Sequence, residues 1–275
     1  MDAAGFILLT DHHAPYFLKL YHPGEPGFDI NQAAVSSQRA GELNIGPQLL
    51  AADAALGVQL FAYMGAPWRP ASASDFDAPT TRANAARLLK RWHAGAPLGA
   101  LATSTDQWIQ QTQATFGDRL AILMPAWGVL RTWAERIADA LNAAGHDPSP
   151  LHGEVYISNF LVGADEALAL VDFDHAADGD AYADLGALAL DVCEFDADYD
   201  QLVEAYAGAA RRDLVARTKL QAVLEDFRWG CAMLLQHRDP QRQTLTDFLG
   251  YGRMRHGRCL SNLQTFDIAS LLGDL

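Results

Sequence analysis

The stretch from residue 151 to residue 185, LHGEVYISNFLVGADEALALVDFDHAADGDAYADL, constrains this chain more than any other. It contains a His-Gly-Glu triplet, an Asn five residues after the Glu, a short apolar hairpin and an Asp-Phe-Asp triplet. Little else in the sequence combines acidic, carboxamide and imidazole groups at such short spacing. Any fold proposed for the chain must therefore explain what this region does.

Two apolar runs in this stretch, residues 159–162 and 167–172, flank a Gly-Ala-Asp-Glu sequence that has the composition of a hairpin loop. A hairpin places the residues before its first strand and after its second strand at the same end. The oxygen-bearing side chains expected to converge there are Glu154, Asn159, Asp172 and Asp174. Carboxylate and carboxamide oxygens suit Mg²⁺ better than a soft metal. This end of the hairpin is a candidate magnesium site.

The chain before this stretch is predicted to form strands and one helix. The runs with strand composition are residues 5–10, 16–21, 48–52 and 58–63. Residues 30–43 are predicted to be helical, with Asp29 as the N-cap. Residues 65–79 are rich in Pro, Ala and Ser and are expected to link two lobes. His12 and His13 are adjacent but lack a third ligand, so a solvated pair in a turn is the favoured interpretation.

Lys19 lies inside the second predicted strand, where the two-residue period of a strand aligns it with Phe17 and Tyr21 on one face. A lysine in a strand is usually a solvated residue of an edge strand. The local sequence supports that interpretation as well as a functional one, and both stay open at this point.

From residue 80 onward, apolar residues recur at helical spacing. Helices are predicted within residues 80–95, 130–145, 182–193 and 202–237. The fold class that follows is α+β, with a small β-rich lobe at residues 1–66 and a larger, mostly helical lobe at residues 67–275. A cleft between two lobes is a common place for a small-molecule site.

The composition limits the partners that the chain can have. A formal net charge of −14 opposes binding to nucleic acid and fits a neutral or cationic small partner. The thiols expected to be free and buried are Cys193, Cys231 and Cys259, because none belongs to a C-x-x-C pair. The N-terminal residues lack the basic segment of a signal peptide, and no apolar run approaches the roughly 18 residues that cross a bilayer. A cytoplasmic protein without a membrane partner is expected.

The motif H-G-E-x-x-x-x-N, followed by V-D-F-D and G-D-A-x-x-D-L, resembles the aminoglycoside phosphotransferase and choline kinase-like superfamily, which has the protein-kinase fold. Further segments match in a consistent order: FLKL around Lys19, LNIGP at residues 43–47 and LLKRWH at residues 88–93. The resemblance extends over roughly 200 of the 275 residues, and residues 152–185 are its most specific part.

This resemblance implies a Mg²⁺-dependent transfer of phosphate from ATP, or GTP, to a hydroxyl group of a small molecule. It implies that Asp172 and Asn159 hold the metal and that Glu154 stands where the family has its catalytic acid. Lys19 would bind the α- and β-phosphates. The adenine base of the nucleotide would be contacted by backbone groups of Phe61, Ala62, Tyr63 and Met64. The residues implied to hold the frame of the site are His152 and Asp184.

Three features depart from the family's pattern. The family has Asp at the catalytic position, and the additional methylene of Glu154 extends its reach by about 1.5 Å. The phosphate-covering strand-turn-strand, which is normally Gly-rich in the family, has only Gly5, at the start of the first predicted strand. The helix at residues 30–43 lacks the acid that the family pairs with its lysine, so Lys19 needs another partner or has none.

Two functions are compatible with these observations. The first is an ATP–Mg²⁺-dependent phosphotransferase that acts on a hydroxyl group of a small metabolite. The acidic surface and Trp229 allow this acceptor to carry a cationic amine group. The second is a catalytically attenuated, kinase-like module that binds a nucleotide, a metabolite or a protein without transferring phosphate. Asn159 and Asp172 favour the first function, whereas Glu154 and the short lobe favour the second.

Overall fold

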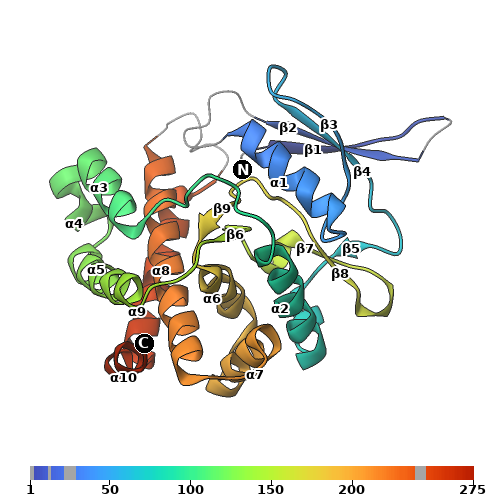
Figure 1. Cartoon of the computed structure of the whole chain (residues 1–275). Helices are drawn as coiled ribbons and strands as arrows, with labels where there is room; N and C mark the ends of the chain where they lie inside the picture. Colours follow the sequence, from blue (N-terminus) through green and yellow to red (C-terminus); the bar gives the residue numbers. More distant parts are fainter. Residues whose placement is uncertain (1–2, 12–13, 22–28, 239–245) are drawn as a thin grey trace.

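The chain forms a small lobe with one antiparallel sheet, which stands on a larger, mostly helical lobe (Figure 1). The computed structural model describes residues 3–11, 14–21, 29–238 and 246–275. His12 and His13 lie outside the described residues, so their predicted solvation stays a prediction. None of the helices in the described part is both long and apolar enough to cross a membrane. The architecture confirms the α+β class expected from the sequence.

The sheet of the small lobe has the strand order β1-β2-β4-β3, and every neighbouring pair is antiparallel. Its strands are β1 (Ala3–Leu8), β2 (Tyr16–Tyr21), β3 (Leu49–Asp53) and β4 (Val58–Ala62). Lys19 pairs with Gly5 of β1 and Gln59 of β4, so it belongs to an interior strand. Its side chain is only 13% exposed. The alternative of a solvated lysine on an edge strand is therefore wrong.

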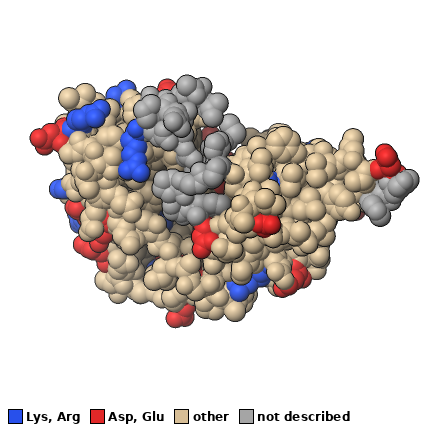
Figure 2. Space-filling view, turned by 90° about the horizontal axis from the view of Figure 1, so that it is seen from above, with Lys and Arg blue, Asp and Glu red and all other residues tan. Residues whose placement is uncertain are grey.

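The two faces of this sheet differ in burial. The face that carries Lys19 also carries Gln59 and Phe61, which are both buried. The opposite face carries Phe6 and Leu20, which are exposed. Figure 2 shows few charged side chains over these protruding strands away from their tip. The face bearing Lys19 is thus the one that meets the rest of the molecule.

One helix, α1 (Ile30–Glu42), packs against the sheet, and Asp29 is its N-cap as predicted. The Asp29 carboxylate accepts a hydrogen bond from the Asn31 backbone N–H at 2.9 Å. The segment at residues 65–79, which was predicted to be an irregular linker between the lobes, contains regular secondary structure. It contains β5 (Arg69–Pro70) and a 3₁₀ turn at Ala73–Phe76, because Arg69 and Pro70 find a strand partner that is distant in the sequence.

The predicted hairpin is confirmed. Strands β7 (Phe160–Val162) and β8 (Leu168–Leu170) pair antiparallel, with Phe160 opposite Leu170, and β5 adds to the other edge of β7. A short ladder between β6 (Ser149–Leu151) and β9 (Ala177–Gly179) brackets the hairpin on both sides in the sequence. The strands of this ladder are three residues long, too short for a period-two pattern to stand out.

Helices make up most of the larger lobe. They are α2 (Pro79–His93), α3 (Thr105–Phe116), α4 (Leu120–Leu123), α5 (Trp127–Ala144), α6 (Ala181–Val192), α7 (Asp196–Ala207), α8 (Arg212–His237), α9 (Phe248–Thr265) and α10 (Ile268–Asp274). Short 3₁₀ turns lie at Gly117–Arg119, Ile157–Asn159 and Ala164–Glu166. The long helix α8 packs against α6 on one side and α9 on another (Figure 1). The predicted helices are confirmed, and residues 202–237 divide between α7 and α8.

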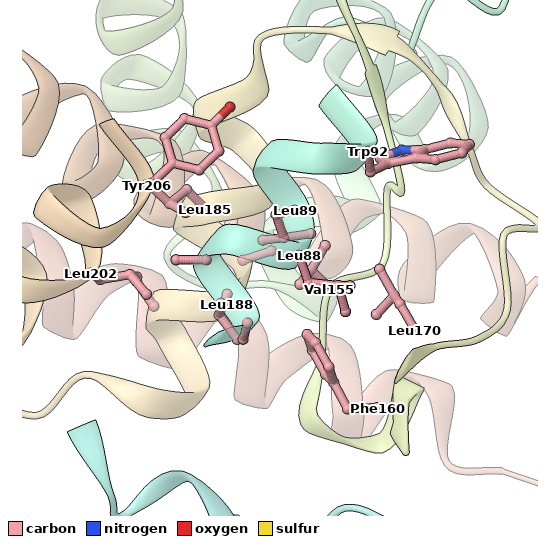
Figure 3. Close-up of a cluster of buried hydrophobic side chains, with 14 of the residues drawn as sticks. Leu88, Leu89, Trp92, Val155, Phe160, Leu170, Leu185, Leu188, Leu202 and Tyr206 are labelled. Atoms are coloured by element: carbon pink, nitrogen blue, oxygen red, sulfur yellow. The ribbon is translucent and has the colours of Figure 1, made fainter. Parts of the chain in front are cut away.

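The buried apolar side chains form two clusters. The first joins α2, α6 and α7 to the β7–β8 hairpin and includes Leu89, Trp92, Phe160, Leu170, Leu185 and Leu188 (Figure 3). The second lies among α3, α5, α8 and α9 and contains Trp127 and Phe227, whose rings stack. Because Phe160 and Leu170 of the hairpin are packed in the first cluster, the loops at the polar end of the hairpin are held in fixed positions.

Helices α6 and α8 approach so closely at Gly186 that no side chain fits between them. A Cβ atom there would lie 2.6 Å from the Ala222 backbone nitrogen and 2.9 Å from the Thr218 carbonyl oxygen. Backbone atoms cannot yield as a flexible side chain can. Gly186 is thus required by the packing of the helix that carries Asp184.

We expect Gly186→Ala to lower the free energy of unfolding by about 1–3 kcal/mol through overpacking. Gly257→Ala is the matched control, because Gly257 lies in α9 and a Cβ there meets nothing within 4 Å. The control should be neutral or stabilising by up to about 1 kcal/mol, since Ala favours helix more than Gly does. Urea unfolding followed by circular dichroism measures both, and equal effects would contradict the close contact.

Candidate active site

A cleft of about 1260 Å³ lies between the small sheet and the helical lobe. Its walls bring together the strand that carries Lys19, the loop after β6 with Glu154, and the loop after β8 with Asp172, Asp174 and His175. The cleft continues along α3, α8 and α9, where its aromatic lining is Trp108, Trp229, Phe248 and Tyr251. The sequence-predicted acids and the lysine therefore face one common space.

Lys19 bridges the small lobe to the loop after β8 by two ion pairs. Its ammonium nitrogen lies 2.6 Å from Asp172 Oδ1 and 2.5 Å from Asp174 Oδ2. Burial opposes the charge of the ammonium, but attraction to the two carboxylates outweighs it, so the pKa of Lys19 is raised. The same ammonium outweighs the effect of burial on Asp172, whose pKa is lowered. Burial, reinforced by the charge of Asp172, raises the pKa of Asp174 to about 6.

Phe173 explains why the acids on either side of it reach the cleft. Its side chain is buried and lies against Trp92 and His152, with ring centroids 4.8 Å and 4.6 Å away. With the middle residue anchored inward, Asp172 and Asp174 are free to turn toward Lys19. Asp172 has a backbone φ of +71°, a region that costs energy for a residue other than glycine. Such strain is typical of functional positions.

His152 holds the strained turn by hydrogen bonds on both sides of its ring. Its Nε2 lies 2.9 Å from the Val171 carbonyl oxygen, and its Nδ1 accepts from the Glu154 backbone N–H at 3.2 Å. This pattern assigns the proton to Nε2. Burial lowers the pKa of His152, which keeps the ring neutral. The ring thereby ties the Glu154 loop to the residue just before Asp172.

Asp184 is the buried anchor of the Glu154 loop. Its carboxylate accepts backbone hydrogen bonds from His152 at 2.6 Å and Gly153 at 3.0 Å. It also contacts His93 Nε2 at 3.0 Å, and His93 Nδ1 lies 2.8 Å from the Tyr206 hydroxyl. Burial alone would raise the pKa of Asp184, but the bond from His93 and the neighbouring imidazoles lower it. Asp184 is therefore a carboxylate whose role is to hold the loop.

Glu154 lies at the rim of the cleft, with its side chain 14% exposed. Its carboxylate oxygen Oε1 is 3.7 Å from His175 Nε2. The preceding Gly153 has a φ of +85°, and a Cβ there would lie 2.4 Å from the His175 carbonyl oxygen. The loops that carry Glu154 and His175 are therefore in backbone contact, which requires the glycine of the His-Gly-Glu triplet.

Not every residue implied by the resemblance contributes to the cleft wall. The described residues that line the cleft do not include Asn159 or residues 61–64. The Asn159 side-chain N–H donates to the Glu154 carbonyl oxygen at 2.8 Å, so its observed role is to shape the loop. Within the described part of the chain, no three His, Cys, Asp or Glu side chains are grouped as metal ligands. Glu154, Asp172 and Asp174 line the cleft together, and the Asn159 side chain lies directly beside them, on the backbone of the Glu154 loop.

A second polar group in the helical lobe was not foreseen from the sequence. The Glu225 carboxylate on α8 accepts hydrogen bonds from the Tyr156 hydroxyl at 2.5 Å and from Trp229 Nε1 at 2.8 Å. The Arg255 guanidinium lies over the Tyr156 ring at 5.2 Å from its centroid. Glu225 and Trp229 line the cleft, and the bond from Tyr156 joins this wall to the Glu154 loop. Four-residue spacing on a helix was its only sequence signal.

We expect Asp184→Asn to lower the free energy of unfolding by about 3 kcal/mol, because an amide cannot accept all of the hydrogen bonds that the carboxylate accepts. Asp165→Asn is the control with the same change of charge at an exposed position. It should stay within about 0.5 kcal/mol of the wild type. Chemical denaturation measures both. A small effect of Asp184→Asn would show that the anchor is dispensable.

The comparisons with known proteins agree with this geometry. Residues 2–220 match the phosphotransferase enzyme family, whereas the search of curated protein sequences gave no match. The fold resembles a choline/ethanolamine kinase family protein from Mesorhizobium loti, with a TM-score of 0.85 and 20% identity over 98% of this chain and 88% of that chain. It also resembles choline kinase LicA from Streptococcus pneumoniae, with a TM-score of 0.78 and 16% identity over 95% and 90%.

The likeness extends to antibiotic kinases at a lower level. A spectinomycin phosphotransferase, solved with ADP and spectinomycin, has a TM-score of 0.62 and 13% identity over 96% of this chain and 90% of that chain. These neighbours confirm the protein-kinase-like, two-lobed fold of the superfamily that the sequence resembles. Since the family match covers most of its length, the chain belongs to the phosphotransferase enzyme family.

Proposed function

We propose that this protein is an ATP–Mg²⁺-dependent phosphotransferase that acts on a hydroxyl group of a small metabolite. The observation that carries the proposal is the meeting of Lys19 from the small lobe with Asp172 from the hairpin at 2.6 Å in the cleft. A fixed cation for phosphate oxygens and a carboxylate for the metal are the parts that phosphoryl transfer requires. Membership of a phosphotransferase family supports the same reaction class.

The residues present fit a magnesium ion. Asp172 is 37% exposed, and its strained backbone presents the carboxylate to the cleft. Mg²⁺ needs only one or two protein carboxylates, because waters and substrate phosphates complete its shell. Asp172 would hold the ion, and Asn159 would add its carboxamide oxygen, since the amide nitrogen is already used on Glu154. When bound, the ion neutralises charge on the transferring phosphate.

The protein's own residues provide positioning and one proton acceptor. Lys19 would bind the α- and β-phosphates, and backbone groups of residues 61–64 would contact the adenine base of the nucleotide. The small lobe would end near residue 66. Glu154 would orient the acceptor hydroxyl and take its proton as the oxygen attacks the γ-phosphorus, while the bond from that phosphorus to the β–γ bridging oxygen breaks and ADP leaves. Asp184 and His152 hold the Glu154 loop in place. In such reactions most of the rate enhancement comes from positioning and charge stabilisation.

The acceptor that the cleft suits best is a small alcohol with an amine group. Glu154, Glu225 and Trp229 line the cleft, and Arg228 of the same wall pairs with Glu225 at 3.6 Å. Carboxylates and aromatic faces attract an ammonium group. The neighbours named as choline or ethanolamine kinases support this class. A cytoplasmic location is part of this proposal, because ATP is a cytoplasmic substrate.

A second candidate is an attenuated module that binds a nucleotide without transferring phosphate. The observation in its favour is the position of Glu154, whose carboxylate leans toward His175 at 3.7 Å. A displacement of about 1 Å in a reacting group can lower a rate about a hundredfold. Binding without turnover would distinguish this candidate from the first.

We expect ATP with Mg²⁺ to raise the melting temperature of the wild-type protein, with a stabilisation of about 2.7 kcal/mol at one hundred times the dissociation constant. Asp172→Ala should remove the magnesium-dependent part of this effect. Differential scanning fluorimetry and titration calorimetry measure it, with Asp165→Asn as an exposed control. If neither ATP nor Asp172→Ala changes anything, the phosphotransferase proposal is wrong.

We expect Glu154→Gln to lower ATP consumption with an accepted alcohol by at least about a hundredfold while nucleotide affinity is retained, because general-base catalysis typically contributes that much. Ethanolamine, choline, aminosugars and nucleosides form the panel of acceptors. Glu154→Asp is the companion variant: a large gain would show that the longer acid attenuates the enzyme. Unchanged turnover in Glu154→Gln would exclude Glu154 as the proton acceptor.

A further inference from the structure

Lys19 needs a permanent anionic partner, and helix α1 does not provide one. A mostly buried ammonium group is costly unless it is paired. Among the described residues, α1 lines the cleft with the neutral Gln32, and the carboxylate of its N-cap, Asp29, is used on the backbone of the helix. The acid of this helix, Glu42, lies in its last turn and accepts a hydrogen bond from Gln38 at 3.0 Å. The partner must therefore come from another element.

The two carboxylates that contact Lys19 are not equivalent. The Asp174 side chain is 5% exposed, whereas that of Asp172 is 37% exposed. Asp174 Oδ2 contacts the ammonium at 2.5 Å, and its Oδ1 accepts a hydrogen bond from the Tyr21 hydroxyl at 2.8 Å. Lys19 and Tyr21 lie two residues apart on one face of β2. Asp174 is thus bound by two side chains of one strand.

Releasing Lys19 would have different costs at the two acids. If Lys19 left Asp174, a buried carboxylate would lose its counter-charge, which is strongly unfavourable. If Lys19 left Asp172, the open side of that carboxylate could turn to a metal ion or to water. The exposure of the two acids therefore decides which contact survives when a nucleotide enters.

We propose that Asp174 is the fixed partner that positions Lys19 for the nucleotide phosphates, in the place of an acid from helix α1. Asp172 is the exchangeable partner, which gives up Lys19 when metal and phosphate bind. This inference rests on the proposed function. It makes Asp174 a positioning residue that acts through Lys19, with Tyr21 as the support that orients its carboxylate.

Double-mutant cycles in the nucleotide-free protein test the pairing itself. The variants are Lys19→Met, Asp174→Asn and Asp172→Asn, with each pair of changes combined and unfolding followed in urea. We expect the coupling of Lys19 with Asp174 to change the unfolding equilibrium constant at least tenfold more than the coupling with Asp172. Equal couplings, or a stronger coupling with Asp172, would overturn the proposal.

Nucleotide binding then separates positioning from metal binding. In EDTA, Asp174→Asn should weaken ATP binding at least tenfold and leave adenosine binding unchanged, and Asp174→Glu should restore part of the loss. Asp172→Asn carries the same charge change two residues away. It should leave or improve ATP binding in EDTA and abolish only the enhancement by Mg²⁺. Calorimetry measures both, and Lys19→Met should remove the effect of Asp174→Asn.

The outcomes distinguish this inference from the proposed function. If Asp174→Asn affects only the magnesium-dependent binding, Asp174 is a metal ligand and the inference is wrong while the proposed function stands. If the wild-type protein binds no ATP at all, the proposed function fails. The coupling measured in the nucleotide-free protein still decides whether Asp174 is the fixed partner of Lys19.

Discussion

The structure depends on one buried ammonium group held between two acids. Lys19 belongs to the small sheet, whereas Asp172 and Asp174 belong to the hairpin of the larger lobe. These ion pairs span more than 150 positions of sequence and fix the sheet over the hairpin. Because a desolvated lysine must be paired, the two lobes cannot separate far without a large electrostatic cost. These ion pairs therefore fix the position of the cleft between the two lobes.

A second buried charge, the Asp184 carboxylate, holds the Glu154 loop in place, as Asp172 and Asp174 hold Lys19. Its carboxylate receives backbone N–H groups of the loop and an imidazole from α2. Helix α6 can carry it to that point because Gly186 lets the helix lie directly on α8. The functional loops are therefore positioned by polar anchors, and the anchors are positioned by close helix packing. The family's phosphotransferase chemistry needs this rigidity, since most of its rate enhancement comes from orientation.

Some features of the site were predictable from local sequence. The hairpin, the N-cap at Asp29 and helices α2, α5, α6 and α8 follow from apolar period and capping residues, which are local properties, whereas α3, α9 and α10 were not predicted. The gathering of Glu154, Asp172 and Asp174 follows from hairpin geometry. The pairing of Lys19 was not predictable, because an interior strand and an edge strand have the same local sequence. The contact of Glu225 with Tyr156 joins two elements that no periodicity relates.

Local sequence is enough to predict the α+β class, the chemically dense hairpin region and the resemblance to a phosphotransferase family, because motif spacing and hydrophobic period are properties of short segments. The folded chain was needed to show which carboxylate is buried with Lys19, which one stays open to the cleft, and that the Asn159 amide binds the Glu154 carbonyl oxygen. Burial and partner choice depend on atoms far apart in sequence. The different exposure of the Asp172 and Asp174 side chains arises only when the chain has folded around them.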